Sequence, residues 1–171
     1  MRNLAIGFDI ASICALTCFG LDKKVPQNYI FLFLFTFANS WLVSISCLYT
    51  DPMIVMEAAL LTLSVVVGLT VYAATTSTDF TYLGAYLWVA MMIFSMGSMI
   101  LYAFGIHHSF FKAVIGVILF SAYLVWDTQM IMGGDDKRAQ FDEDSYILAA
   151  VSLYLDIINL FINLLQILND E

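Results

Sequence analysis

The chain has 171 residues, of which 62% are hydrophobic and 12% are charged, whereas a soluble domain is roughly half apolar and a quarter charged. This composition excludes an ordinary soluble domain and is typical of an integral membrane protein. With 14 acidic residues, 6 basic residues and no basic patch, the chain also lacks the features of a nucleic-acid-binding protein.

Six stretches are apolar over roughly the 20 residues that an α-helix needs to cross a bilayer. In chain order they are Leu4–Leu21, Tyr29–Thr50, Met53–Ala74, Tyr82–Ile106, Phe110–Met132 and Tyr146–Leu168. The sequence therefore predicts an all-α, polytopic membrane protein that forms a single transmembrane domain over residues 1–171. The lipid bilayer is its expected surroundings.

The first three spans carry few charged groups. Asp9 lies within the first span, and Glu57 lies one turn into the third, where it is expected at the outer water boundary and near a helix N-terminus. The Thr-Asp-Pro run at 50–52 predicts the start of the third helix. The cysteines have no CxxC spacing or histidine partners and are expected to be small core residues; they are Cys14, Cys18 and Cys47.

The connections between the fourth and fifth spans and between the fifth and sixth spans contain no pattern typical of an enzyme. His107 and His108 form an adjacent pair between the fourth and fifth spans, without a second group of metal ligands nearby in sequence. The acidic loop GGDDKRAQFDEDS at 133–145 lacks the spacing of a calcium-binding loop and is expected to be solvated. No phosphate-binding loop, nucleophile elbow or HExxH motif occurs, so we expect no enzymatic activity and no bound cofactor.

Lysine and arginine positions predict the topology, because short cytoplasmic or matrix loops retain positive charge. With six spans, four basic residues fall on one side of the membrane and two on the other. The majority are Lys23, Lys24, Lys137 and Arg138, and the minority are Arg2 and Lys112. This distribution places both termini on the outer or lumenal side.

The last span contains a stripe of polar side chains. At about 100° per residue, six polar positions fall within an arc of about 80° on one helix face; they are Ser145, Ser152, Asp156, Asn159, Asn163 and Gln166. This face must meet protein or water rather than lipid. The amides are expected to act mainly as hydrogen-bonding contacts between helices.

Asp156 calls for a different explanation, because a carboxylate at mid-span is costly unless it is neutralised, paired or hydrated. The preceding span carries Asp127 near its inner end. In antiparallel neighbouring helices, the two carboxyl groups would differ in depth by only about 6 Å. No lysine or arginine lies in the central part of a span, so a facing pair would share a proton, bind a cation or admit water.

Several motifs resemble the Bax-inhibitor family, the transmembrane BAX-inhibitor-motif or Lifeguard proteins. LVWDTQMI at 124–131 and YILAAVSLYLDIINLFINLLQIL at 146–168 resemble the last two helices of that family. TTSTDFT at 75–81 resembles the connection before its fifth helix, and VMEAALLTLSVVVGLTVYA at 55–73 is similar to its fourth helix. The resemblance covers nearly the whole chain.

The resemblance implies a seven-helix fold with a central last helix. It also implies that Asp127 and Asp156 match a paired-aspartate site for protons and calcium, with Ser152, Asn159 and Asn163 as accessory polar groups. Lys23 or Lys24 would match a basic partner found in some relatives. Because the sequence predicts only six spans, the resemblance implies that the helix missing relative to the family is its first.

Two functions follow as hypotheses. In the first, the protein is a pH-sensitive calcium leak channel or calcium/proton exchanger of the endoplasmic reticulum or Golgi, linked in eukaryotic relatives to suppression of cell death. In the second, it is a structural accessory subunit, for example in the mitochondrial inner membrane. In that case another membrane protein or lipid would occupy the groove left by the missing helix.

Overall fold

The computed structural model describes residues 25–105, 110–133 and 145–170. The predicted span Leu4–Leu21 lies outside the described residues, so the structure describes five of the six expected spans. Other residues of interest also lie outside them: Asp9, Cys14, Cys18, Lys23, Lys24, His107 and His108. Within the described ranges the secondary structure is entirely helical, with five helices long and apolar enough to cross a membrane.

The helix bounds agree closely with the predicted spans. The five long helices are α2 (Gln27–Leu48), α3 (Pro52–Thr75), α4 (Gly84–Ala103), α5 (Phe110–Met132) and α6 (Tyr146–Asn169). A short 3-10 helix, η2 (Thr81–Leu83), precedes α4. The fourth predicted span began at Tyr82 because hydropathy does not distinguish a 3-10 turn from the α-helix that follows it.

Local interactions account for several helix ends. Pro52 occupies the first turn of α3, and the Asp51 side chain caps this helix by accepting a hydrogen bond from the Met53 amide at 2.8 Å. This confirms the predicted helix start at 50–52. Beyond the end of α5, Gly133 has a φ of 58°, a left-handed conformation that glycine adopts without a steric penalty.

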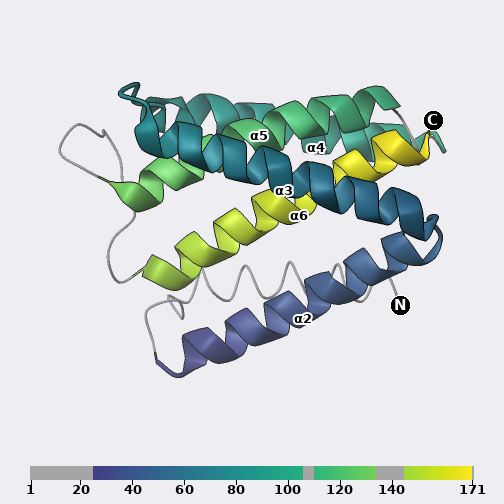
Figure 1. The fold of residues 1–171 in the computed structure, drawn as a ribbon, viewed down its shortest axis with the longest axis horizontal. Coiled ribbons are helices and arrows are strands. Elements are labelled where there is room, and N and C mark those ends of the chain that lie inside the picture. Colours follow the sequence, from purple (N-terminus) through teal and green to yellow (C-terminus); the bar gives the residue numbers. More distant parts are fainter. Residues whose placement is uncertain (1–24, 106–109, 134–144, 171) are drawn as a thin grey trace.

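Helices α5 and α6 lie at the centre of the described bundle. They run antiparallel and pack against each other and against α3, whereas α2 packs mainly on α6 and α4 mainly on α5 (Figure 1). We expected the last helix to be the most enclosed. Helix α5 has nine buried residues against seven in α6, and it also supports α4 and η2. It nevertheless exposes several large apolar side chains, whereas α6 exposes only one, Tyr146 at its start.

The contact between α2 and α6 is built on one aromatic side chain. Phe35 is 0% exposed and packs with Ile147 and Val151. Its ring also meets the Tyr154 ring edge-on, with centroids 6.0 Å apart. Nearer the helix starts, the Asn28 amide donates a hydrogen bond to the Tyr146 hydroxyl at 3.0 Å.

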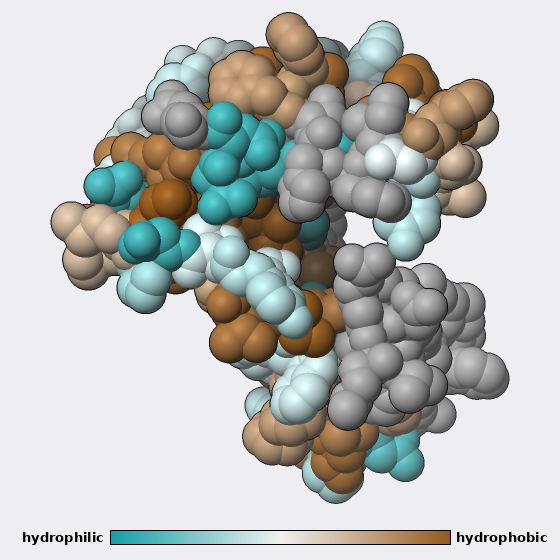
Figure 2. All heavy atoms as spheres, turned by 90° about the vertical axis from the view of Figure 1, so that its right-hand side faces the viewer, coloured by the Kyte–Doolittle hydropathy of each residue, from teal (hydrophilic) through white to brown (hydrophobic). Residues whose placement is uncertain are grey.

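The outer surface has the polarity expected of a bilayer-spanning bundle. Large apolar side chains are exposed along α2, α3, α4 and α5, most densely on α4, where only Leu87 is buried, whereas α6 exposes only one, Tyr146 at its start. Figure 2 views the end of the bundle that carries the α2–α3 turn and the C terminus, where hydrophilic side chains lie among hydrophobic ones. Polar groups at helix ends are able to meet water while the apolar flanks face lipid.

Candidate functional site

A pair of buried carboxyl groups lies between the two central helices. Asp127 on α5 is 2% exposed and Asp156 on α6 is 5% exposed. The two carboxyl groups lie close enough to interact directly with each other. The antiparallel packing of α5 and α6 accounts for this meeting, because Asp127 lies near the end of α5 and Asp156 lies in the first half of α6.

One oxygen of each carboxyl group is left without a partner. Asp127 Oδ1 and Asp156 Oδ2 are buried and accept no hydrogen bond within the structure as described. Burying an ionised carboxylate without compensation is costly. A carboxyl–carboxyl hydrogen bond needs a proton on one partner, because an ionised carboxylate only accepts. The geometry therefore suits a pair that holds a proton or a cation.

No cationic side chain in the described ranges neutralises the pair. Lys112 is the only lysine or arginine among these residues, and it lies in the first turn of α5, at the opposite end of that helix from Asp127. The predicted basic partners, Lys23 and Lys24, lie outside the described residues.

Two further side chains belong to the environment of the pair. Ser152, one turn before Asp156, lies beside the Asp127 carboxyl group. Its hydroxyl donates a hydrogen bond to the Ala149 carbonyl at 3.1 Å. Tyr123, one turn before Asp127, interacts electrostatically with both carboxyl groups. Ser152 was predicted from the polar stripe. Tyr123 was missed, although its position four residues before Asp127 was a usable signal, since such residues share a helix face.

Two of the remaining stripe residues, Asn159 and Asn163, donate hydrogen bonds within their own helix rather than between helices. Asn163 is buried and Asn159 is half-buried. The Asn159 amide donates to the Leu155 carbonyl at 2.8 Å, and the Asn163 amide donates to the Asn159 carbonyl at 2.7 Å. Both acceptors belong to α6 itself. For these donors the prediction of bonds between helices was wrong, because backbone carbonyls one turn earlier are within reach of the amides.

Asn163 instead contacts α5 by close packing. A Cβ atom added at Gly116 would collide with the Oδ1, Cγ and Nδ2 atoms of the Asn163 side chain. Gly116 is thus the residue that lets α5 approach this part of α6.

Replacing Gly116 with alanine should force these helices apart and lower the free energy of unfolding by about 1–3 kcal/mol, the usual cost of overpacking. Thermal unfolding in detergent would measure the change. Gly68→Ala on α3 is the matched control, because nothing lies within 4 Å of an added Cβ there. Equal destabilisation by both substitutions would contradict this account of Gly116.

The other candidate residues do not form a second polar site. Glu57 is exposed near the start of α3, and Cys47 is a half-buried free thiol. Among the residues that the structure describes, no group of three or more His, Cys, Asp or Glu side chains is placed to hold a metal ion. Calcium prefers six to eight oxygen ligands, so the carboxyl pair alone would supply only part of a calcium site.

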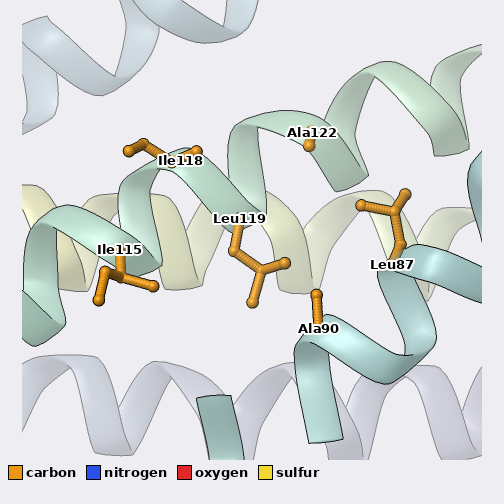
Figure 3. A pocket seen from close by; sticks show the side chains of 6 residues that line it. All are labelled: Leu87, Ala90, Ile115, Ile118, Leu119 and Ala122. Atoms are coloured by element: carbon orange, nitrogen blue, oxygen red, sulfur yellow. The ribbon is translucent and has the colours of Figure 1, made fainter. Parts of the chain in front are cut away.

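A separate cavity of about 330 Å³ lies between α4 and α5. Figure 3 shows its lining side chains, and all of them are apolar. They are Leu87, Ala90, Ile115, Ile118, Leu119 and Ala122. This cavity has no group that would bind an ion, so the carboxyl pair is the candidate functional site.

Comparisons with known proteins find Bax-inhibitor and Lifeguard proteins as relatives of this chain. The family model described as "Inhibitor of apoptosis-promoting Bax1" matches residues 2–171. Protein LIFEGUARD 4 of Arabidopsis thaliana is 40% identical over 150 residues, which cover 85% of this chain and 58% of the relative. Protein LIFEGUARD 1 of the same plant is 37% identical over 177 residues, covering 99% of this chain and 73% of the relative.

A fungal relative shows the same relationship. Bax inhibitor 1 of Schizosaccharomyces pombe is 33% identical over 163 residues, which cover 91% of this chain and 58% of the relative. The chain thus spans about three fifths of the length of several relatives.

Proposed function

Because the chain belongs to the Bax-inhibitor family, we propose that it provides a pH-sensitive path for calcium across its membrane, as a leak channel or a calcium/proton exchanger. The Asp127–Asp156 pair is the gate of this path. The observation that carries the proposal is the burial of two neighbouring carboxyl groups, each with one unpartnered oxygen, between the two central helices.

The proposed mechanism follows from the charge of the pair. At neutral pH the two carboxyl groups share about one proton, which supplies the donor that a hydrogen bond between them requires. Raising the pH removes this proton. Two adjacent carboxylates then repel each other in a medium of low dielectric constant, and α5 and α6 move apart.

Calcium acts on the same equilibrium. A divalent cation between the carboxylates replaces the shared proton and compensates both charges. The remaining oxygen ligands would come from water or from groups such as the Ser152 hydroxyl, since calcium accepts neutral oxygen ligands as well as carboxylates. Tyr123 is the other titratable group beside the pair, and its neutral phenol leaves the charge balance to the two aspartates.

The proposal is tested by calcium flux in vesicles reconstituted with the purified protein. Flux should be low at pH 5.5 and rise as the pH is raised, because a higher pH removes the shared proton. Protein-free vesicles and an ionophore give the two reference levels. Vesicles that carry no calcium at any pH, while the ionophore still works, would contradict the proposed function.

One observation favours a second function, that of a structural subunit in a larger membrane complex, for example in the mitochondrial inner membrane. Helix α4 packs mainly on α5 and η2 among the described elements, and it exposes most of its large apolar side chains. The apolar cavity beside it would accept a lipid chain or side chains of a partner. Crosslinking in native membranes distinguishes the two functions, because a subunit remains in a complex of fixed composition.

A further inference from the structure

The side chain of Gln129 is bonded entirely to the backbone around the α3–α4 connection (residues 76–80). Gln129 is 0% exposed. Its Nε2 atom donates to the Ala73 carbonyl at 3.3 Å and to the Thr78 carbonyl at 2.9 Å. Its Oε1 atom accepts a hydrogen bond from the Phe80 amide at 2.7 Å. Both amide hydrogens and the oxygen of this buried group are thus satisfied.

Trp126 holds the far end of the same connection. Its indole Nε1 donates to the Thr81 carbonyl at 3.1 Å. The ring also lies against Gly84, where an added Cβ would come within 2.9 Å of it. Two side chains of α5, one turn apart, therefore fix both ends of the α3–α4 connection.

Asp127 lies on the same turn of α5 but points elsewhere. At about 100° per residue, Trp126 and Gln129 are about 60° apart around the helix, whereas Asp127 is about 100° from Trp126 and about 160° from Gln129. This end of α5 is consequently held from two sides. One side is bonded to the connection, and the other presents Asp127 to Asp156 on α6.

We propose that Gln129 is a positioning residue for the carboxyl pair: by tying α5 to the α3–α4 connection, it fixes the rotation and depth at which Asp127 meets Asp156. The proposal rests on the proposed function only in treating the pair as the gate. When the carboxyl groups separate, the connection must either move with α5 or lose three buried hydrogen bonds. The α3–α4 connection is thus part of the gate rather than a passive turn.

Spin-label distances in the full chain test this role without any measurement of calcium. Labels at Ser77, Ile131 and Ala150, all exposed, would be introduced in a background lacking the native cysteines. The pair 77–131 reports the connection against α5, and the pair 131–150 reports α5 against α6. In wild type each pair should give one narrow distance distribution. Gln129→Met keeps the side-chain length but removes all three bonds, so both narrow distributions should be lost.

A matched control separates positioning from general destabilisation. Asn28→Leu removes another 0% exposed amide that joins elements, since Asn28 bonds to Tyr146 between α2 and α6. This variant should leave both distributions narrow. Gln129→Glu should give distance distributions almost as narrow as those of wild type, because a neutral glutamic acid retains the acceptor for the Phe80 amide and one donor.

A milder variant covers the case in which Gln129→Met does not fold. Trp126→Phe keeps an aromatic ring and removes only the bond to Thr81, so the 77–131 distribution should broaden more than the 131–150 distribution. Unchanged distributions in both Gln129→Met and Trp126→Phe would overturn the proposal. Equal broadening by Asn28→Leu would overturn it as well.

The infrared band of the protonated carboxyl pair provides a second readout. The difference spectrum between wild type and Asp156→Asn identifies this band, whose frequency depends on hydrogen bonding. The frequency of this band should shift in Gln129→Met and stay unchanged in Asn28→Leu. An unshifted band in Gln129→Met would contradict the positioning role of Gln129.

If wild type carries no calcium but the label distances change as expected, the proposed function fails while the role of Gln129 stands. If calcium flux follows pH but the label distances do not change in the Gln129 and Trp126 variants, the role of Gln129 fails while the proposed function stands.

Discussion

Asparagine at position 127 or 156 should abolish the pH dependence of calcium flux. Asparagine preserves the size and much of the hydrogen bonding of aspartate but cannot ionise, so the repulsion that separates α5 from α6 never develops. Wild-type flux should follow the deprotonated fraction of the pair, which rises by roughly tenfold per pH unit well below its pKa and levels off above it. Each variant should stay near the low-pH level of wild type at every pH, measured in reconstituted vesicles.

Asp51→Asn is the matched control for these two substitutions. Asp51 is exposed and caps α3, and asparagine caps helices about as well as aspartate. Its pH profile should equal that of wild type. A profile retained by both Asp127→Asn and Asp156→Asn would exclude the pair as the gate. A wild-type protein that keeps its carboxyl groups paired yet carries no calcium would favour the structural-subunit function.

Phe35→Ala should be the most destabilising of the substitutions considered, at about 3–5 kcal/mol. The side chain is 0% exposed and is the main apolar contact of α2 with α6 through Ile147 and Val151. Its removal leaves a cavity that these neighbours fill only in part. Unfolding in a mixed detergent and denaturant titration would measure the loss.

Phe33→Ala provides the comparison on the same helix. Phe33 is 70% exposed, and its substitution should change the free energy of unfolding by no more than about 0.5 kcal/mol. Similar losses for the two variants would mean that Phe35 does not hold α2 to α6.

The spans could be predicted because apolar length is a local property of the sequence. The predicted bounds of α5 are those of the structure, and the start of α3 followed from Asp51 and Pro52. The meeting of Asp127 with Asp156 could be expected from depth and from antiparallel order, because an acid within a span needs a partner.

The surroundings of the pair could not be predicted in the same way. Gln129 lies near a helix end, where a polar side chain is ordinary, and its partners are backbone atoms about 50 residues earlier in the chain. Sequence patterns carry no signal for such bonds. Asn159 and Asn163 show a related limit of sequence patterns. A polar face indicates which side of a helix is buried, but it does not indicate whether the side-chain donors on that face bond to another helix or to the backbone of the same helix.

The most direct test of the gate combines flux and distance in the same wild-type vesicles. Calcium flux and the 131–150 label distance between α5 and α6 would be recorded together from pH 5.5 to pH 8. If the carboxyl pair opens the path by repulsion, calcium flux and the α5–α6 distance should rise over the same pH range. Flux that rises with pH while the α5–α6 distance stays constant would contradict the account.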